Sequence, residues 1–102
     1  MIKVSVFYPN SPGAKFDMNY YTTRHMPMVQ KKIASCRGIG AEQGLAGGSP
    51  GTAATYIAIG HLLFDSVEAF TSAFPPHAPE ILADVPNYTN VQPIIQINQI
   101  TL

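Results

Sequence analysis

Residues 54–74 read "ATYIAIGHLLFDSVEAFTSAF", and this stretch decides the fold because its apolar residues change from a period of two to a helical period. Its first part, residues 54–64, predicts a β-strand. Apolar residues occupy both faces of that strand, so we expect both faces to be covered. One face carries Thr55, Ile57, Ile59, His61 and Leu63, and the other carries Tyr56, Ala58, Gly60 and Leu62.

The second part of the stretch predicts a helix that begins at Asp65. The carboxylate of Asp65 can cap the first turn, and Glu68 three positions later completes a capping box. Pro75 and Pro76 end this helix, and residues 79–83 form a second short helical piece. The apolar stripe of the first piece consists of Val67, Phe70, Ala73 and Phe74.

A strand and a helix of the same kind come earlier in the chain. Residues 2–8 alternate as a strand does, and the turn "PNSPG" follows them. Asp17 is a good N-cap for a helix over residues 17–36. Pro27 cannot bond to the carbonyl of Thr23 and should therefore kink this helix. The side of the helix that faces the core carries Met18, Tyr21, Thr22, His25, Val29 and Ile33.

The remaining segments complete a ferredoxin-like pattern. We expect a short strand at 39–45, a glycine-rich loop at 46–52 and a final strand at 94–102. The order β-α-β-β-α-β predicts an α+β fold with a four-stranded antiparallel sheet, in a single domain over residues 1–102. The helices cover one sheet face, and the other face carries Tyr, Ile and Phe side chains. Two such sheets packed face to face would form a homodimer, a dimeric α+β barrel.

Composition and charge exclude several classes of protein. The chain has 102 residues and a net charge of zero, and its six Lys and Arg residues are scattered. Nucleic-acid binding needs a basic stripe, and an anionic membrane surface needs clustered cations, so we expect neither partner. The short apolar N-terminus is no signal peptide, and no run reaches the ~18 apolar residues of a membrane helix. These features favour a cytoplasmic protein.

Four stretches of the chain resemble the EthD family of dimeric α+β barrel proteins. They are "FYP" (7–9), "FDMNYYTTRHMPMV" (16–29), "SVEAFTSAF" (66–74) and "ILADVPNYTNVQPIIQINQI" (81–100). The family takes its name from a gene cluster that degrades an ether pollutant, where its member is an accessory to an oxidative pathway. Related barrels include lactone isomerases, polyketide cyclases and small monooxygenases that use no metal. Likeness of fold does not choose among these activities.

His25 is the candidate catalytic residue. It lies in the middle of the buried helix face, and an ordinary pKa of about 6.5 suits an imidazole to proton transfer near neutrality. The structural alternative is a core histidine bonded to a strand backbone or to Tyr21. The family resemblance favours the functional role, because related barrels place a histidine here to act on a lactone or ring carbonyl.

Three further residues are candidate ligand contacts. Tyr21 shares the face of His25 and could orient it or a ligand oxygen. His61 is a polar residue in the middle of a strand, which indicates a cavity or a satisfied core histidine. Tyr88 could line the pocket mouth or lie at the dimer interface. Tyr20 should pack at the helix flank, and Asp84 and Asn87 should organise the turn around Pro86.

The sequence predicts no cofactor and no metal. It has neither a G-x-G-x-x-G fingerprint nor a P-loop, and its histidines lack the local spacings of zinc ligands. We therefore expect a pocket between the first helix and the sheet that binds a small apolar carbonyl, lactone or aromatic metabolite. With His25 as acid/base, the chemistry would be that of an isomerase, a cyclase or a cofactor-free oxidoreductase. The alternative is a non-catalytic ligand-binding or accessory protein of an oxidative pathway.

Overall fold

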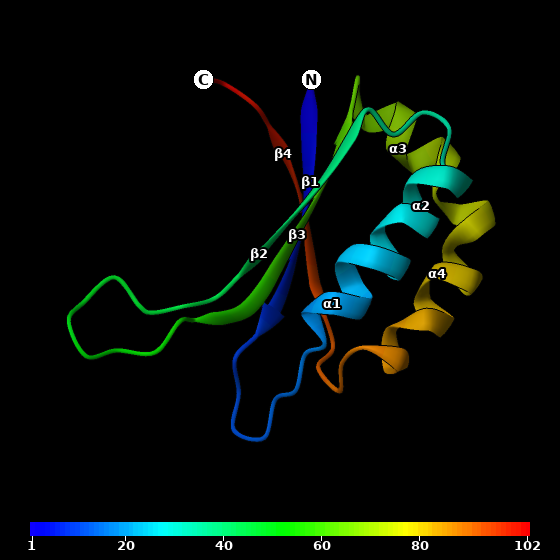
Figure 1. The fold of residues 1–102 in the computed structure, drawn as a ribbon. Coiled ribbons are helices and arrows are strands. Elements are labelled where there is room, and N and C mark those ends of the chain that lie inside the picture. Colours follow the sequence, from blue (N-terminus) through cyan, green and yellow to red (C-terminus); the bar gives the residue numbers. More distant parts are fainter.

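Four antiparallel strands form one sheet, and all helices lie on one of its faces in the computed structural model, which describes residues 1–102 (Figure 1). The strand order is β2-β3-β1-β4, so the ferredoxin-like β-α-β-β-α-β prediction is confirmed. The strands are β1 (Ile2–Pro9), β2 (Gly38–Gln43), β3 (Tyr56–Phe64) and β4 (Ile94–Gln99). None of the helices is both long and apolar enough to span a bilayer.

The register of the central strands decides which side chains face the helices. Val4 of β1 pairs with Leu62 of β3, and Ser5 pairs with His61. Successive residues of a strand point to opposite faces, so Val4 and Leu62 lie in the core under the helices, whereas Ser5 and His61 lie on the open face. Both edge strands are shorter than the expected 39–45 and 94–102.

The first helix contains a π-helical turn just before its proline. The segments α1 (Met18–Tyr20), the π turn (Tyr21–His25) and α2 (Met26–Lys32) follow one another directly. Within the π turn the Met26 amide bonds to the Tyr21 carbonyl, five residues back. This wider turn accommodates Pro27, which has no N–H for the usual bond to Thr23, and the helical backbone continues past it to Lys32.

The first helix starts where the sequence predicted, but it ends earlier than expected. The Asp17 carboxylate accepts a hydrogen bond from the Tyr20 amide, so the predicted N-cap is confirmed. The helix ends at Lys32, before the expected residue 36, because Ile33 already has an extended backbone. Ile33 is nevertheless fully buried and remains part of the core.

The second helical segment is longer than expected and begins one residue later. It consists of α3 (Val67–Ala73), a 3-10 turn (Pro75–His77), α4 (Ala78–Asp84) and a second 3-10 turn (Val85–Asn87). The N-cap is Ser66, whose hydroxyl accepts from the Ala69 amide, so the prediction of Asp65 was wrong. Asp65 is instead held by the Arg37 guanidinium, 2.8 Å away.

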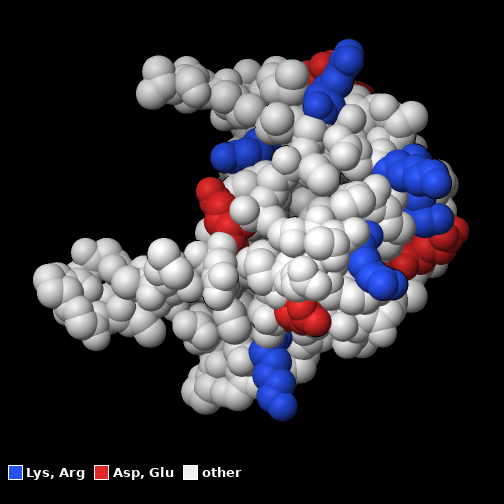
Figure 2. Space-filling view, viewed as in Figure 1, with Lys and Arg blue, Asp and Glu red and all other residues white.

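The open sheet face is less apolar than the sequence pattern implied. Phe7, Ile59 and Ile94 lie on it in one row, but the next row is polar. That next row contains His61 and Ser5. The His61 Nε2 lies 2.9 Å from the carboxylate of Glu42, which pairs with Ile59, and the Ser5 hydroxyl accepts from the Asn98 amide of the row beyond. The hairpin between β2 and β3 projects from the body, and Lys and Arg are dispersed over the surface in view (Figure 2).

Candidate functional site

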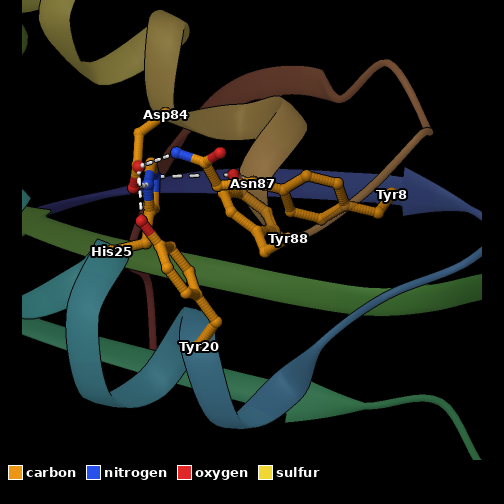
Figure 3. A network of polar contacts seen from close by, with 6 residues as sticks. All are labelled: Tyr8, Tyr20, His25, Asp84, Asn87 and Tyr88. Carbon is orange, nitrogen blue, oxygen red and sulfur yellow. Dashed lines mark hydrogen bonds and ion pairs between the residues drawn. The ribbon is translucent and has the colours of Figure 1, made fainter.

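A hydrogen-bonded chain of side chains joins the first helix to the end of α4 and to the sheet (Figure 3). At its centre is His25, which is only 4% exposed. The His25 Nδ1 lies 2.9 Å from the Asp84 Oδ2, and the Nε2 lies 3.4 Å from the Tyr88 hydroxyl. The Tyr88 hydroxyl is in turn 2.7 Å from the Tyr8 hydroxyl of β1.

The Asp84 carboxylate collects three donors. It accepts from the Tyr20 hydroxyl at 2.6 Å and the Asn87 amide at 2.9 Å, in addition to His25. Burial raises the pKa of Asp84, but the three hydrogen bonds together outweigh burial and hold this pKa below its usual value. Asp84 is therefore ionised near neutrality, and an ionised carboxylate requires the proton of the imidazole on Nδ1.

The other ring nitrogen of His25 is then a free base. Burial lowers the pKa of His25, and the contact with Asp84 offsets only part of this effect. The ring is neutral near pH 7, and its Nε2 lone pair points toward Tyr88 across a long contact. Burial also raises the pKa of Tyr88 and Tyr8, so both remain phenols that can donate a hydrogen bond.

The ring of Tyr21 packs against one face of the His25 imidazole. The two rings stack with a centroid distance of 5.5 Å and an interplanar angle of 13°. Residues 21 and 25 are four positions apart in one helical stretch, so their side chains lie on the same buried face and their rings meet there. The Tyr21 hydroxyl occupies the space over Gly60 of β3 that any Cβ at this position would fill.

These polar groups close one end of an apolar pocket between the helices and the sheet. Apart from His25 and three tyrosines, every lining side chain is a hydrocarbon or a thioether, and the cavity volume is about 50 Å³. One water needs roughly 10–15 Å³, so the cavity accepts a few small atoms. It is lined by Val4, Val6, Tyr8, Tyr21, His25, Met26, Val29, Leu62, Phe70, Phe74, Ile81, Leu82, Val85, Tyr88, Pro93 and Ile95.

The structure brings three of the four sequence candidates together and separates the fourth. Tyr21, His25 and Tyr88 line the same pocket. His61 does not join them, because it follows Gly60 in β3 and therefore points to the open face. Its Nε2 contacts Glu42, and its buried Nδ1 has no hydrogen-bond partner. No three histidine, cysteine, aspartate or glutamate side chains gather in a way that could hold a metal ion.

Sequence reasoning missed Tyr8, Tyr20 and Asp84. Asp84 does organise its turn through Asn87, as expected, but it also holds His25. Tyr20 lies at the flank of the helix as expected, yet its hydroxyl reaches Asp84. The only available signal for Tyr8 was its place on the core face of the first strand, where a hydroxyl needs a partner.

Comparisons with known proteins agree with this architecture. The family model described as "EthD domain" matches residues 14–92. The crystal structure of an EthD-like protein from Ralstonia eutropha JMP134 is 41% identical, with a TM-score of 0.94, and the match covers 99% of this chain and 92% of that one. No curated protein matches the chain.

Two more distant structures share the fold. An ethyl tert-butyl ether D (EthD) family protein from Bacillus halodurans C-125 is 15% identical, with a TM-score of 0.67 and 99% of both chains covered. A protein from Arabidopsis thaliana is 13% identical, with a TM-score of 0.71, and the match covers 100% of this chain and 97% of that one.

Proposed function

The chain belongs to the EthD family, and we propose that it binds a small, largely apolar carbonyl, lactone or aromatic metabolite between the first helix and the sheet, with His25 as acid/base. One observation carries this proposal. A neutral imidazole, with its Nδ1 committed to Asp84, presents its Nε2 at the polar end of an otherwise apolar pocket. Pockets of this kind, with few polar groups in an apolar lining, are typical of small-molecule sites.

The arrangement suits proton abstraction next to a carbonyl group. The His25 Nε2 would take a proton from the carbon beside the carbonyl, and the electron pair of that C–H bond would move to the oxygen to give an enolate. Tyr88 can donate a hydrogen bond to this oxygen, since Tyr8 can donate to Tyr88. Asp84 stabilises the imidazolium while it holds the proton. In a substrate with a double bond between the β and γ carbons the enolate is conjugated, and return of the proton from His25 to the γ carbon moves the double bond to the α,β position and completes an isomerisation.

The same pocket supports a second function. A binding or accessory protein of an oxidative, degradative pathway would hold the metabolite and deliver it without chemistry. The contact between the His25 Nε2 and the Tyr88 hydroxyl is long, at 3.4 Å, which favours a site in which the Tyr88 hydroxyl turns to donate its hydrogen bond to a ligand oxygen. We place both functions in a cytoplasmic homodimer in which the open sheet faces of two copies meet.

The test begins with the metabolites that co-purify with the protein, identified by mass spectrometry. The bound carbonyl compound is then incubated in heavy water with the parent protein and with the His25→Leu variant. An acid/base role predicts deuterium beside the carbonyl with the parent and none above background with the variant. Binding without exchange in the parent would leave the accessory function and remove the acid/base role. The Val67→Leu variant on the outside of α3 is the matched control.

A further inference from the structure

The inner cavity is too small for the whole of a typical metabolite. A cavity of about 150 Å³ holds one benzene ring, whereas the cavity beside His25 has about 50 Å³. The space beside the imidazole therefore fits an open-chain carbonyl group and one or two carbons, but not a ring. The rest of a ligand must lie elsewhere.

A surface groove continues the cavity outward. This groove, between α4 and β4, has a volume of about 460 Å³ and shares four lining residues with the inner cavity. The shared residues are Leu82, Val85, Pro93 and Ile95. Leu82 is 51% exposed and Ile95 is 47% exposed, so two large apolar side chains stand at the junction in contact with water.

The groove is apolar at its junction with the inner cavity because the helices do not cover the edge strand β4 there. Ile95 and Ile97 pair with Val6 and Val4 of β1, so they lie on the helix side of β4, yet both are exposed. No charged residue lines the groove. Its outer part adds the neutral polar side chains of Thr89, Asn90 and Gln92 together with Pro86 and Val91. An exposed apolar surface next to a ligand pocket marks a place where a ligand or a partner binds.

We propose that the ligand is an open-chain carbonyl compound with an unbranched, uncharged apolar tail. This inference rests on the proposed function and names its substrate class. The carbonyl oxygen accepts a hydrogen bond from Tyr88 in the inner cavity, the carbon beside the carbonyl faces the His25 Nε2, and the tail passes Leu82 and Ile95 into the groove. The lack of any cation along the groove excludes a tail that ends in a carboxylate or a phosphate there.

A second copy of the chain is the competing occupant of the groove. The expected dimer uses the open sheet face, which carries Ile94 of β4, whereas the groove carries Ile95 on the opposite face. A dimer through the open face therefore does not use the face of β4 on which Ile95 lies. The small molecule is the better occupant because the groove leads directly to the only titratable base in the pocket.

The experiment measures affinity along a series of methyl ketones, namely butanone, hexan-2-one, octan-2-one and decan-2-one, by NMR chemical-shift titration of the full chain. We expect affinity to rise about three- to fourfold for each methylene buried in the groove. The signals of His25 and Tyr88 should shift with every ketone, and the methyl signals of Leu82 and Ile95 only with the longer ones. Benzaldehyde, whose carbonyl carries a ring, should bind more weakly than hexan-2-one.

The Leu82→Glu variant tests whether the apolar tail of the ligand passes Leu82. A carboxylate at the junction should reduce the ratio of decan-2-one affinity to butanone affinity at least tenfold, roughly the loss of two buried methylenes. The control is Val67→Glu, which adds the same charge at an exposed position of α3 and should keep the parent ratio.

The outcomes separate the two proposals. If butanone shifts His25 and Tyr88 but affinity is flat along the series, the tail assignment fails and the proposed function stands. An unchanged affinity ratio in Leu82→Glu places the tail elsewhere and overturns the inference, as would tighter binding of benzaldehyde. A change in oligomeric mass in Leu82→Glu would assign the groove to a second copy. If no ketone binds, both this inference and the carbonyl part of the proposed function fail.

Discussion

The Nδ1 of His25 lies 2.9 Å from the Oδ2 of Asp84, a contact between residues 59 positions apart in the chain. It joins the π turn of the first helix to the last residue of α4, and Tyr20 adds a second bond to the same carboxylate. Because the Asp84 side chain is only 18% exposed, water screens this contact weakly. The contact therefore controls both the protonation and the orientation of the imidazole.

We predict that the Asp84→Asn variant lowers the pKa of His25 below that of the parent. Burial already lowers this pKa, and the carboxylate is the group that opposes burial. The neutral amide removes that opposition and leaves a similar shape. The pKa is measured by following the ring C–H signals of His25 by NMR while the pH is changed.

The control for this variant is Glu42→Gln, which removes the carboxylate beside His61 on the other sheet face. It should leave the titration of His25 unchanged. An equal or higher pKa of His25 in Asp84→Asn would show that the carboxylate does not act on the imidazole.

The order of elements was predictable because it depends on local patterns. The strand at 56–64 has a strict period of two, and Asp17 carries its own capping signal. The start of the second helix was missed by one residue because Asp65 and Ser66 are both good caps, and only the distant Arg37 decides between them. The π turn was missed because proline in a helix ordinarily indicates a kink.

Only the residues of the candidate site that lie on the first helix could be predicted from the sequence. Tyr21 and His25 share a helix face that the sequence displays. Asp84 and Tyr8 join them from segments about 60 and about 15 positions away, and no local spacing in the sequence predicts such a contact. His61 was grouped with His25 because both interrupt apolar faces, and the strand register that separates them is a tertiary property.

We predict that the protein is a dimer in solution, with a mass near twice the 11.0 kDa of one chain. The motive is the row Phe7, Ile59 and Ile94 on a sheet face that no helix covers. An Ile59→Asp variant should raise the dissociation constant roughly tenfold or more, because the interface would have to bury a charge. Light scattering across a concentration series measures both masses. A parent of monomer mass at micromolar concentration would contradict the prediction, and Val67→Asp serves as the control.

We predict that Gly60→Ala destabilises the fold by about 1–3 kcal/mol, the usual range for an overpacked core. A Cβ at residue 60 would overlap the Tyr21 hydroxyl oxygen and lie 3.0 Å from its Cζ. Tyr21→Phe removes the overlapping atom, so the double variant should recover part of the loss. Denaturant unfolding of the two single variants and the double variant measures this coupling.

Gly48→Ala provides the matched comparison, because a Cβ there meets nothing within 4 Å. It should leave the free energy of unfolding almost unchanged. Additive losses in Gly60→Ala and Tyr21→Phe would show that the tyrosine does not occupy the space over Gly60.

The last prediction concerns the dependence of stability on pH and the replacement of His25 by leucine. Burial holds the pKa of His25 in the folded protein below the value of about 6.5 expected in the unfolded chain. As the pH falls below about 6.5, the unfolded chain takes up the proton first, so stability that is fully present above this pH is progressively lost. The ordinary pKa of Asp84, near 3.8, is too low for that group to contribute above pH 5.

The His25→Leu variant should lose this dependence, because leucine cannot be protonated. It gives up the hydrogen bond to Asp84, which keeps Tyr20 and Asn87, and the long, weak contact with Tyr88, which keeps Tyr8; in exchange it gains buried apolar surface. These two effects are each about 1–2 kcal/mol and oppose one another. We therefore expect the variant to match the parent at pH 7.5, to exceed it at pH 5 and to lose ligand binding or turnover. Urea unfolding at the two pH values measures this, with His77→Leu as the control. A variant that is less stable than the parent at both values would make His25 a structural residue.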